Sequence, residues 1–76
     1  MKSADIVRLG IRRVMVNDGL TQYKISKNCG LLQPQISRFM NGADARLHTL
    51  DTICNKGLNR TLLEVMQIGS RPEIKI

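Results

Sequence analysis

Aromatic side chains are almost missing from this 76-residue chain, which has one Tyr, one Phe and no Trp. A surface that holds single-stranded nucleic acid by stacking needs several exposed rings, so that kind of binding is excluded. Two cysteines and one histidine are too few for a four-ligand zinc site without help from Asp or Glu. We therefore expect neither a metal nor another cofactor.

Long apolar runs are missing too, since none approaches the roughly 20 residues of a membrane-spanning helix. Residues 1–5 lead into an arginine-rich segment, which is unlike a secretory signal peptide. Groups for catalysis are scarce: His48 has no partner placed beside it, the six carboxylates are scattered, and no glycine-rich loop suits a nucleotide phosphate. We expect a cytoplasmic protein that is not an enzyme and does not enter the membrane.

Acidic residues are few, with 6 Asp+Glu against 12 Lys+Arg, so the formal charge is +6. No acidic residue lies between Asp18 and Asp44, a window that contains Lys24, Lys27 and Arg38. A second basic group near the start consists of Arg8, Arg12 and Arg13. This distribution suits contact with a polyanion. The alternative is a solvated basic surface, and the helical pattern inside the window favours the polyanion.

A first helix is predicted at 4–18, where apolar residues recur at i, i+4 and i+7. These residues share one face of the helix: Val7, Ile11 and Val14. Ser3 is a suitable N-cap. Gly19 can adopt the left-handed conformation that ends many helices.

A second helix is predicted at 22–29, with Thr21 as its N-cap and Gly30 at its end. Leu20 and Ile25 stand at the two positions of a hydrophobic staple. Cys29, four residues after Ile25, continues the inward face, so we expect a buried thiol rather than a disulfide.

A third helix is predicted at 33–41 and a fourth at 46–56, with a loop at 42–45 between them. The third turns Ile36, Phe39 and Met40 toward the core, which leaves Pro34, Arg38 and Asn41 pointing away from it. The fourth has four apolar residues on one face and ends at a glycine: Leu47, Leu50, Ile53, Cys54 and then Gly57. Together these elements predict an all-α domain of four to five helices.

The C-terminal segment, 59–76, fits two structures. Thr61 and Glu64 have the spacing of a capping box, and Gly69 fits a C-cap, which predicts a short helix at 62–68. Residues 72–76 alternate between polar and apolar, which fits a strand or a hairpin. In both cases the segment is apolar enough to close the core and contact a second copy, and a domain this small gains from dimerisation.

The segment from about 21 to 41 has the spacing of a helix-turn-helix. Ser26 is small enough for the two helices to cross closely, and Gly30 tolerates the positive φ of a tight turn. Apolar residues fall where the angle between the helices must be filled: Ile25, Cys29, Leu31, Ile36 and Phe39. Such a unit exposes its second helix, which can enter a DNA major groove.

The same segment contains the run QPQISRFMNG from Gln33 to Gly42, together with LTQ at 20–22 and GLL at 30–32. Through these runs the chain resembles the Cro/C1-type (XRE) family of phage and bacterial regulators over about residues 6–58. The resemblance implies a lambda repressor-like fold and binding to double-stranded DNA. It places base contacts at Gln33, Pro34 and Arg38, with Gln35 and Ser37 beside them. It places phosphate contacts at Gln22, Asn41 and Arg46. Nearby, we expect three further groups to reach phosphates: Tyr23, Lys24 and Lys27.

The function that we expect is that of a transcriptional regulator, most simply a repressor that binds an inverted-repeat operator as a homodimer. One alternative is an antitoxin-like protein that docks on a partner through its C-terminal segment and regulates its own operon. Another is a packager of nucleic acid without sequence preference, although packaging does not need Gln and Arg at base-reading positions.

Overall fold

The computed structural model describes residues 3–72, which form five helices and, within that range, no strand. The elements are α1 (Ser3–Asp18), α2 (Gln22–Cys29), α3 (Gln33–Met40), α4 (Leu47–Thr52) with the π-helical turn η1 (Ile53–Gly57), and α5 (Leu62–Ser70). The all-α prediction is confirmed. No helix in the described range is both long enough and apolar enough to cross a membrane.

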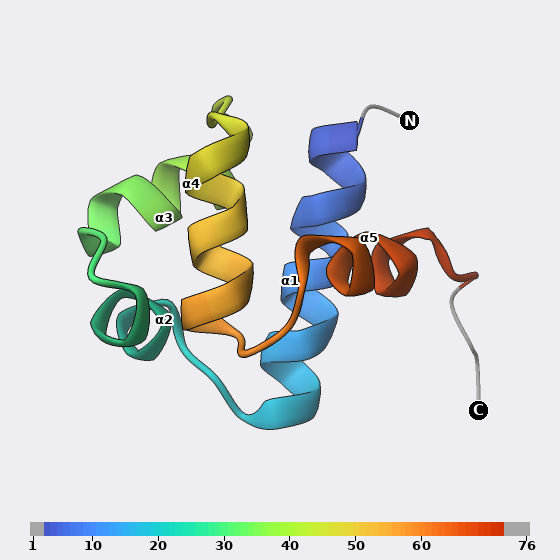
Figure 1. Ribbon diagram of the computed structural model, residues 1–76, viewed down its shortest axis with the longest axis horizontal. Helices are drawn as coiled ribbons and strands as arrows, with labels where there is room; N and C mark the ends of the chain where they lie inside the picture. Colours follow the sequence, from blue (N-terminus) through green and yellow to red (C-terminus); the bar gives the residue numbers. More distant parts are fainter. Residues whose placement is uncertain (1–2, 73–76) are drawn as a thin grey trace.

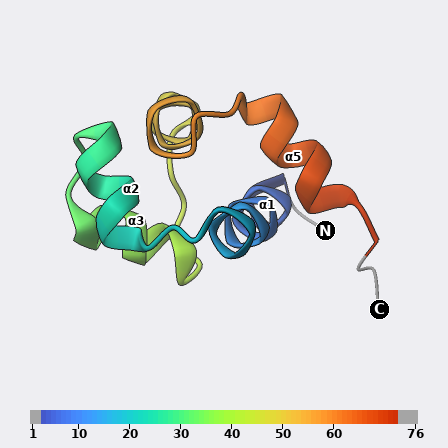
Figure 2. The same cartoon turned by 90° about the horizontal axis from the view of Figure 1, so that it is seen from below.

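The helices are arranged around the continuous rod formed by α4 and η1. This rod and α1 run alongside each other, with α2 and α3 beyond the rod and α5 across α1 (Figures 1 and 2). The core draws side chains from every helix, and the largest fully buried ones are Phe39, Ile11, Ile25, Ile36, Ile53, Val14 and Val65. The predicted inward faces of the first three helices are therefore confirmed.

The caps around α2 explain why it starts and ends where the sequence predicts. Thr21 has an extended backbone, and its Oγ1 accepts a hydrogen bond of 3.1 Å from the Lys24 amide. Gly30 has a φ of 77° and its amide donates to the Ser26 carbonyl at 2.9 Å. The N-cap prediction for Ser3 is wrong, because Ser3 already lies within α1.

The predicted helix at 46–56 is present over nearly its whole length, but its second half is a π-helical turn rather than an α-helix. The α-helix ends at Thr52, and the next five residues form a π-turn in which the Leu58 amide donates to the Ile53 carbonyl at 3.1 Å. A π-turn holds more residues per turn than an α-helix, so it shifts the inward face. Leu58 is consequently buried, whereas Leu47, expected on the inward face, is 70% exposed at the start of α4.

The C-terminal segment is helical through Ser70, so the helix prediction is correct and no hairpin forms in residues 59–72. The capping box is present: Thr61 Oγ1 accepts from the Glu64 amide at 3.1 Å, and Glu64 Oε1 accepts from the Thr61 amide at 3.4 Å. The proposed strand at the end of the chain falls largely on residues 73–76, outside the described range.

Gly69 is not the C-cap of α5 but a buried residue inside it. A Cβ at Gly69 would overlap the Ile6 carbonyl oxygen, and one at Gly10 would overlap the Val65 carbonyl oxygen. The backbones of α1 and α5 thus touch at two glycines, and any side chain at either position would force the helices apart.

We predict that Gly69→Ala lowers the free energy of unfolding by about 1–3 kcal/mol, the usual cost of overpacking. Helix propensity alone would raise the free energy of unfolding instead, because Ala in a helix interior is favoured over Gly by about 1 kcal/mol. Urea denaturation followed by circular dichroism measures the change, and Ser70→Ala, on the exposed end of α5, is the control. An unchanged or higher midpoint for Gly69→Ala would show that the crossing has room for a methyl group.

Candidate nucleic-acid interface

The side of α3 that faces away from the core is exposed and polar. Ile36, Phe39 and Met40 are at most 4% exposed, and a rotation of 100° per residue turns the remaining side chains to solvent. The predicted base-contacting residues Gln33, Pro34, Gln35 and Arg38 are all exposed, and Ser37 is half-buried at the edge. The structure thus brings these five residues together on one short helix.

The start of α3 is capped from within the helix. Leu32 has no side-chain acceptor, and Gln35 Oε1 instead accepts a hydrogen bond from the Leu32 amide at 3.1 Å. Pro34 in the first turn lacks only an amide that would have no helical partner. Gln35 therefore has a local structural role in addition to its place on the exposed face.

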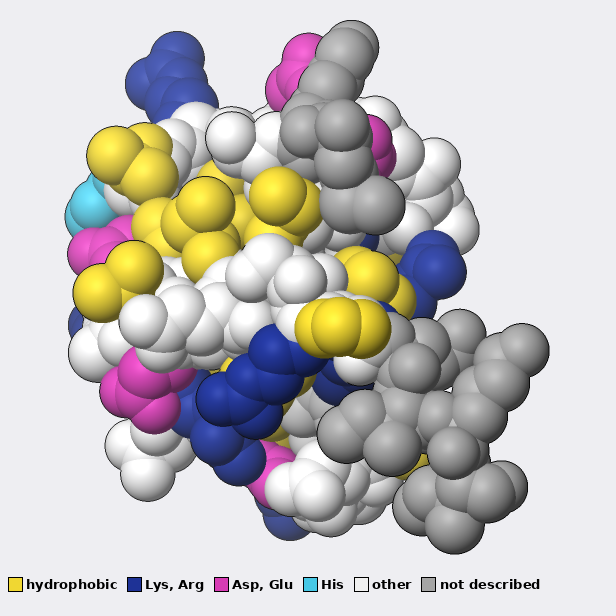
Figure 3. All heavy atoms as spheres, turned by 90° about the vertical axis from the view of Figure 1, so that its right-hand side faces the viewer, with side chains coloured by type: hydrophobic (Ala, Val, Ile, Leu, Met, Phe, Trp, Pro, Cys, Tyr) yellow, Lys and Arg dark blue, Asp and Glu magenta, His cyan; other side chains and the backbone are white. Residues whose placement is uncertain are grey.

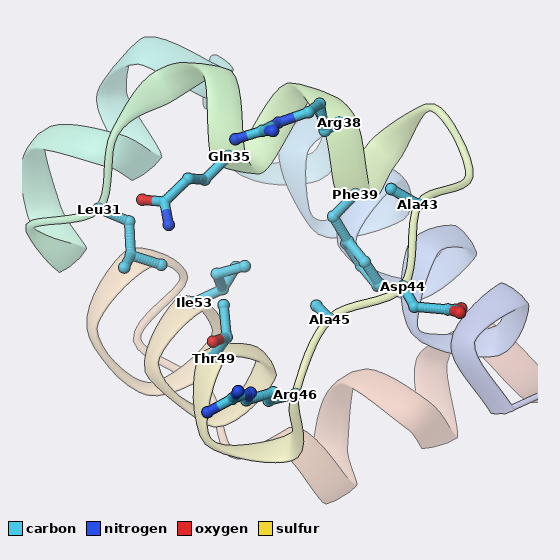
Figure 4. Close-up of a pocket in the computed structure, with 10 residues that line it drawn as sticks. All are labelled: Leu31, Gln35, Arg38, Phe39, Ala43, Asp44, Ala45, Arg46, Thr49 and Ile53. Atoms are coloured by element: carbon cyan, nitrogen blue, oxygen red, sulfur yellow. The ribbon is translucent and has the colours of Figure 1, made fainter.

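A hollow of about 340 Å³ lies between α3, the loop at 41–46 and α4. Gln35 points into it from α3, while Arg38 and Arg46 lie at opposite edges (Figure 4). Asp44, the nearest carboxylate of the loop, points away from both arginines (Figure 4). Thr49, which the sequence analysis missed, also lines the hollow; it stands three residues after Arg46, and this helical spacing was the available signal.

The remaining predicted phosphate-binding residues stand on α2 and at the end of α3. Gln22 is half-buried as the first residue of α2, whereas Tyr23, Lys24 and Lys27 are exposed. Lys27 Nζ lies 5.4 Å from the centroid of the Tyr23 ring, within the range of a cation–π contact. Asn41 is exposed at the C-cap of α3, where its Nδ2 lies 3.5 Å from Ser37 Oγ.

Arg8 does not belong to the exposed basic surface that the sequence predicts. Its side chain is only 12% exposed, and it donates from Nε to the Phe39 carbonyl at 2.6 Å and from Nη2 to the Ala43 carbonyl at 2.7 Å. Its guanidinium lies 4.7 Å from the centroid of the Phe39 ring, and Nη1 pairs with Asp5 at 2.8 Å. Arg8 therefore ties α1 to the end of α3 and to the loop that follows.

Arg13 has a similar structural role at α5. Its Nη1 donates to the Ile68 carbonyl at 2.6 Å and to the Arg71 carbonyl at 2.7 Å, at the C-terminal end of that helix. Arg12 is exposed and makes a longer bond, 3.2 Å, to the Met40 carbonyl. The first basic group thus serves mainly to join helices, and the exposed cations near α3 are Lys24, Lys27, Arg38 and Arg46, with Arg12 at its C-terminal end.

The thiols offer no reactive group to this surface. Cys29 and Cys54 are both free and buried, as predicted. Burial, with a smaller contribution from Asp51, raises the pKa of the Cys54 thiol to about 12, so this thiol stays protonated at neutral pH. Residues 3–72 contain no group of three or more His, Cys, Asp or Glu that could hold a metal ion.

Comparison of the chain with known protein families, with curated proteins and with solved structures finds no match. The interpretation of the α3 surface therefore depends on its own chemistry and geometry.

We predict that Arg8→Met lowers the free energy of unfolding by about 2–3 kcal/mol, because hydrogen bonds to a charged group contribute about 1.5–3 kcal/mol each and the methionine retains part of the packing. Arg12→Met, which loses one longer and more exposed bond, is the matched control and should cost less than about 1 kcal/mol. Both are measured by urea denaturation. Equal losses in the two variants would show that Arg8 does not anchor α3.

Proposed function

We propose that this protein is a sequence-specific regulator of transcription that binds double-stranded DNA with α3 in the major groove, in the manner of the Cro/C1 family. The observation that carries the proposal is the composition of the α3 surface, where Arg38 faces solvent opposite a buried apolar face and Gln33 and Gln35 are exposed at the tip and flank of the same helix. A surface of this kind is suited to reading base edges, because a helix fits the major groove with its N-terminal residues leading.

The chemistry of these side chains supports reading of sequence. Arginine can make two hydrogen bonds to guanine O6 and N7, and glutamine can make two to adenine N6 and N7. Pro34 has no hydrogen-bonding side chain, so we expect it to contact an apolar group such as the methyl of thymine. Each bidentate pair contributes about 1–3 kcal/mol of discrimination against the wrong base.

The cations around α3 support contact with the DNA backbone. Lys24 and Lys27 on α2, and Arg46 at the start of α4, are exposed on the elements that border α3. Contacts of this kind hold a protein in register on the duplex without reading its sequence. Gln22 and Asn41, at the start of α2 and the end of α3, complete the proposed set.

The apolar side of α5 supports binding as a homodimer. Leu63 is 67% exposed, and Leu62 and Met66 beside it are only partly covered. Hydrophobic side chains gather on the side of the molecule that carries α5 (Figure 3). A two-fold dimer would present two α3 helices to half-sites roughly 34 Å apart, so the operator would be an inverted repeat. Occupation of such a site within a promoter would repress transcription.

The same apolar side supports a second candidate, an antitoxin-like protein whose α5 docks on a different protein. The two candidates differ in what covers Leu63: a second copy in the regulator, a partner in the antitoxin. Sedimentation of the purified protein distinguishes the two candidates. A stable dimer indicates the regulator, whereas a protein that forms no defined dimer and leaves α5 uncovered indicates that a partner protein is missing.

Selection from a random duplex library at about physiological salt tests the main proposal. Enrichment of an inverted repeat with half-sites about one helical turn apart would support a dimeric sequence-specific regulator. Retention without enrichment would indicate a nucleic-acid packager, and no retention would contradict DNA binding altogether.

Arg38→Ala should weaken binding to the selected site by about 1–3 kcal/mol and relax the preference at one base pair of each half-site. Repeating the selection with the variant measures both effects. Arg71→Ala is the control, because it removes an exposed charge outside the proposed surface. If Arg38→Ala keeps the original preference at every position, Arg38 does not read a base.

Lys27→Ala should weaken binding to all duplexes alike, since it removes a single phosphate contact. The steepness with which the logarithm of the binding constant falls with the logarithm of salt concentration should decrease by about one. Titrations at several salt concentrations give the slope. Lys56→Ala, which removes an exposed lysine from η1, should leave it unchanged. An unaltered slope in Lys27→Ala would place Lys27 outside the interface.

A further inference from the structure

The outer side of α1 carries apolar residues that neither the core nor the proposed DNA surface uses. Val16 is 86% exposed, the highest value among the large exposed hydrophobic side chains. Leu9 lies seven residues earlier, on the same stripe of the helix, and is half-buried. Val16 and Leu9 thus give this stripe of α1 an apolar character that packing within the described residues does not use.

Two adjoining hollows run along this stripe. One, of about 540 Å³, is lined by Leu9, Arg12, Arg13, Val16 and Asn17. The other, of about 330 Å³, is lined by Arg12, Met15, Val16 and Leu20. Because the two share Arg12 and Val16, they form one shallow, open depression along α1, here called the α1 groove, which continues past Leu9 and Arg12 into a third hollow at the end of α3.

The α1 groove is positively charged at its middle. Arg12 and Arg13 are held by bonds to the carbonyls of Met40, Ile68 and Arg71, and each guanidinium keeps further N–H groups for another acceptor. The carboxylates of α1 do not compete for them, since Asp5 pairs with Arg8 at 2.8 Å and Asp18 with Arg60 at 3.4 Å. The groove therefore combines apolar contacts with two positioned cations.

These charges argue against a second copy of the chain as the occupant. A two-fold interface centred on the stripe from Leu9 to Val16 would have its axis near Arg12 and Arg13. Each of these arginines would then face its own symmetry mate, and like charges brought together across an interface are unfavourable. A partner of opposite charge meets no such penalty.

We propose that the α1 groove binds an acidic amphipathic helix of a partner protein. Leu9 and Val16 are separated by seven residues, or about 10 Å along α1, which matches apolar residues at i, i+4 and i+7 of a second helix. Glutamates beside that apolar stripe would accept hydrogen bonds from Arg12 and Arg13. The groove meets α3 only at its C-terminal end, where Arg12 binds the Met40 carbonyl, so the N-terminal part of α3 is left free for DNA.

The test uses a fluorescein-labelled, capped helical peptide of about 14 residues, with Leu at i, i+4 and i+7 and Glu and Ala elsewhere. A matched peptide has Gln in place of every Glu. Anisotropy gives the affinity of the full chain for each, and amide chemical shifts locate the contact. We expect the acidic peptide to bind at least about 10-fold more tightly than its Gln counterpart, with shifts concentrated at Leu9, Arg12 and Val16.

Variants of the full chain sharpen the test. Val16→Glu should lower the affinity for the acidic peptide about 10-fold or more, and Arg12→Gln should lower it about 2- to 5-fold. Leu32→Ser is the control and should have no effect, because Leu32 is 69% exposed but lies outside the α1 groove. Because Val16 is so exposed, its variant should fold normally, which circular dichroism verifies.

Four outcomes would overturn the proposal: no binding, equal affinity for both peptides, shifts concentrated on α3, or self-association of the chain that Val16→Glu abolishes. The last would make a second copy the occupant. None of these results depends on whether the protein binds DNA, so failure here is distinct from failure of the proposed function.

Discussion

The contact between Phe39 and Arg8 is the constraint on which the rest of the surface depends. The Phe39 ring is 2% exposed, so it determines which side of α3 faces the core. The Arg8 guanidinium lies against that ring and also binds the Phe39 carbonyl at 2.6 Å, which fixes the helix at its last turn. A second bond, to Ala43, extends the restraint to the loop that carries Arg46. One arginine on α1 thus sets the relative positions of the side chains proposed to read bases and to hold the backbone.

The arginines of this small chain are divided between structure and surface. Arg8 and Arg13 donate additional hydrogen bonds to the carbonyls of Phe39 and Ile68, at the ends of α3 and α5, each of which also accepts from a backbone amide. Arg38 and Arg46 make no side-chain hydrogen bond within residues 3–72 and stand at the edges of one hollow. The formal charge of +6 therefore overstates the cations available to a polyanion, and their position on α2, α3 and α4 is more informative than their number.

Local signals predicted the elements around α3 well. Thr21 and Gly30 mark the ends of α2 because their preferences act within a few residues, through one side-chain bond and one positive φ. The capping box at Thr61 is present in the structure as well, although the sequence left both helix and strand open for the C-terminal segment. The error at Gly69 concerns a contact between distant parts of the chain. Gly69 has the residue type of a C-cap, yet its position is decided by the crossing with α1, 59 residues earlier in the chain at Gly10, which no local pattern contains.

The contrast between local signals and contacts over long sequence distances also explains how much of the candidate site could be predicted. The exposure of Pro34 and Arg38 follows from the periodicity of α3, whereas the base-reading roles of Gln33 and Arg38 come from the family resemblance and stay a prediction. The role of Arg8 could not be predicted, because periodicity gives the direction of a side chain but not the helix end that it reaches. The stripe from Leu9 to Val16 was equally hidden, since apolar residues on an amphipathic helix are assigned to the core until packing shows that another face already fills it. In a chain of 76 residues the core covers only part of each helix, and the proposed contacts with a partner helix, DNA and a second copy use the sides of α1, α3 and α5 that it leaves exposed.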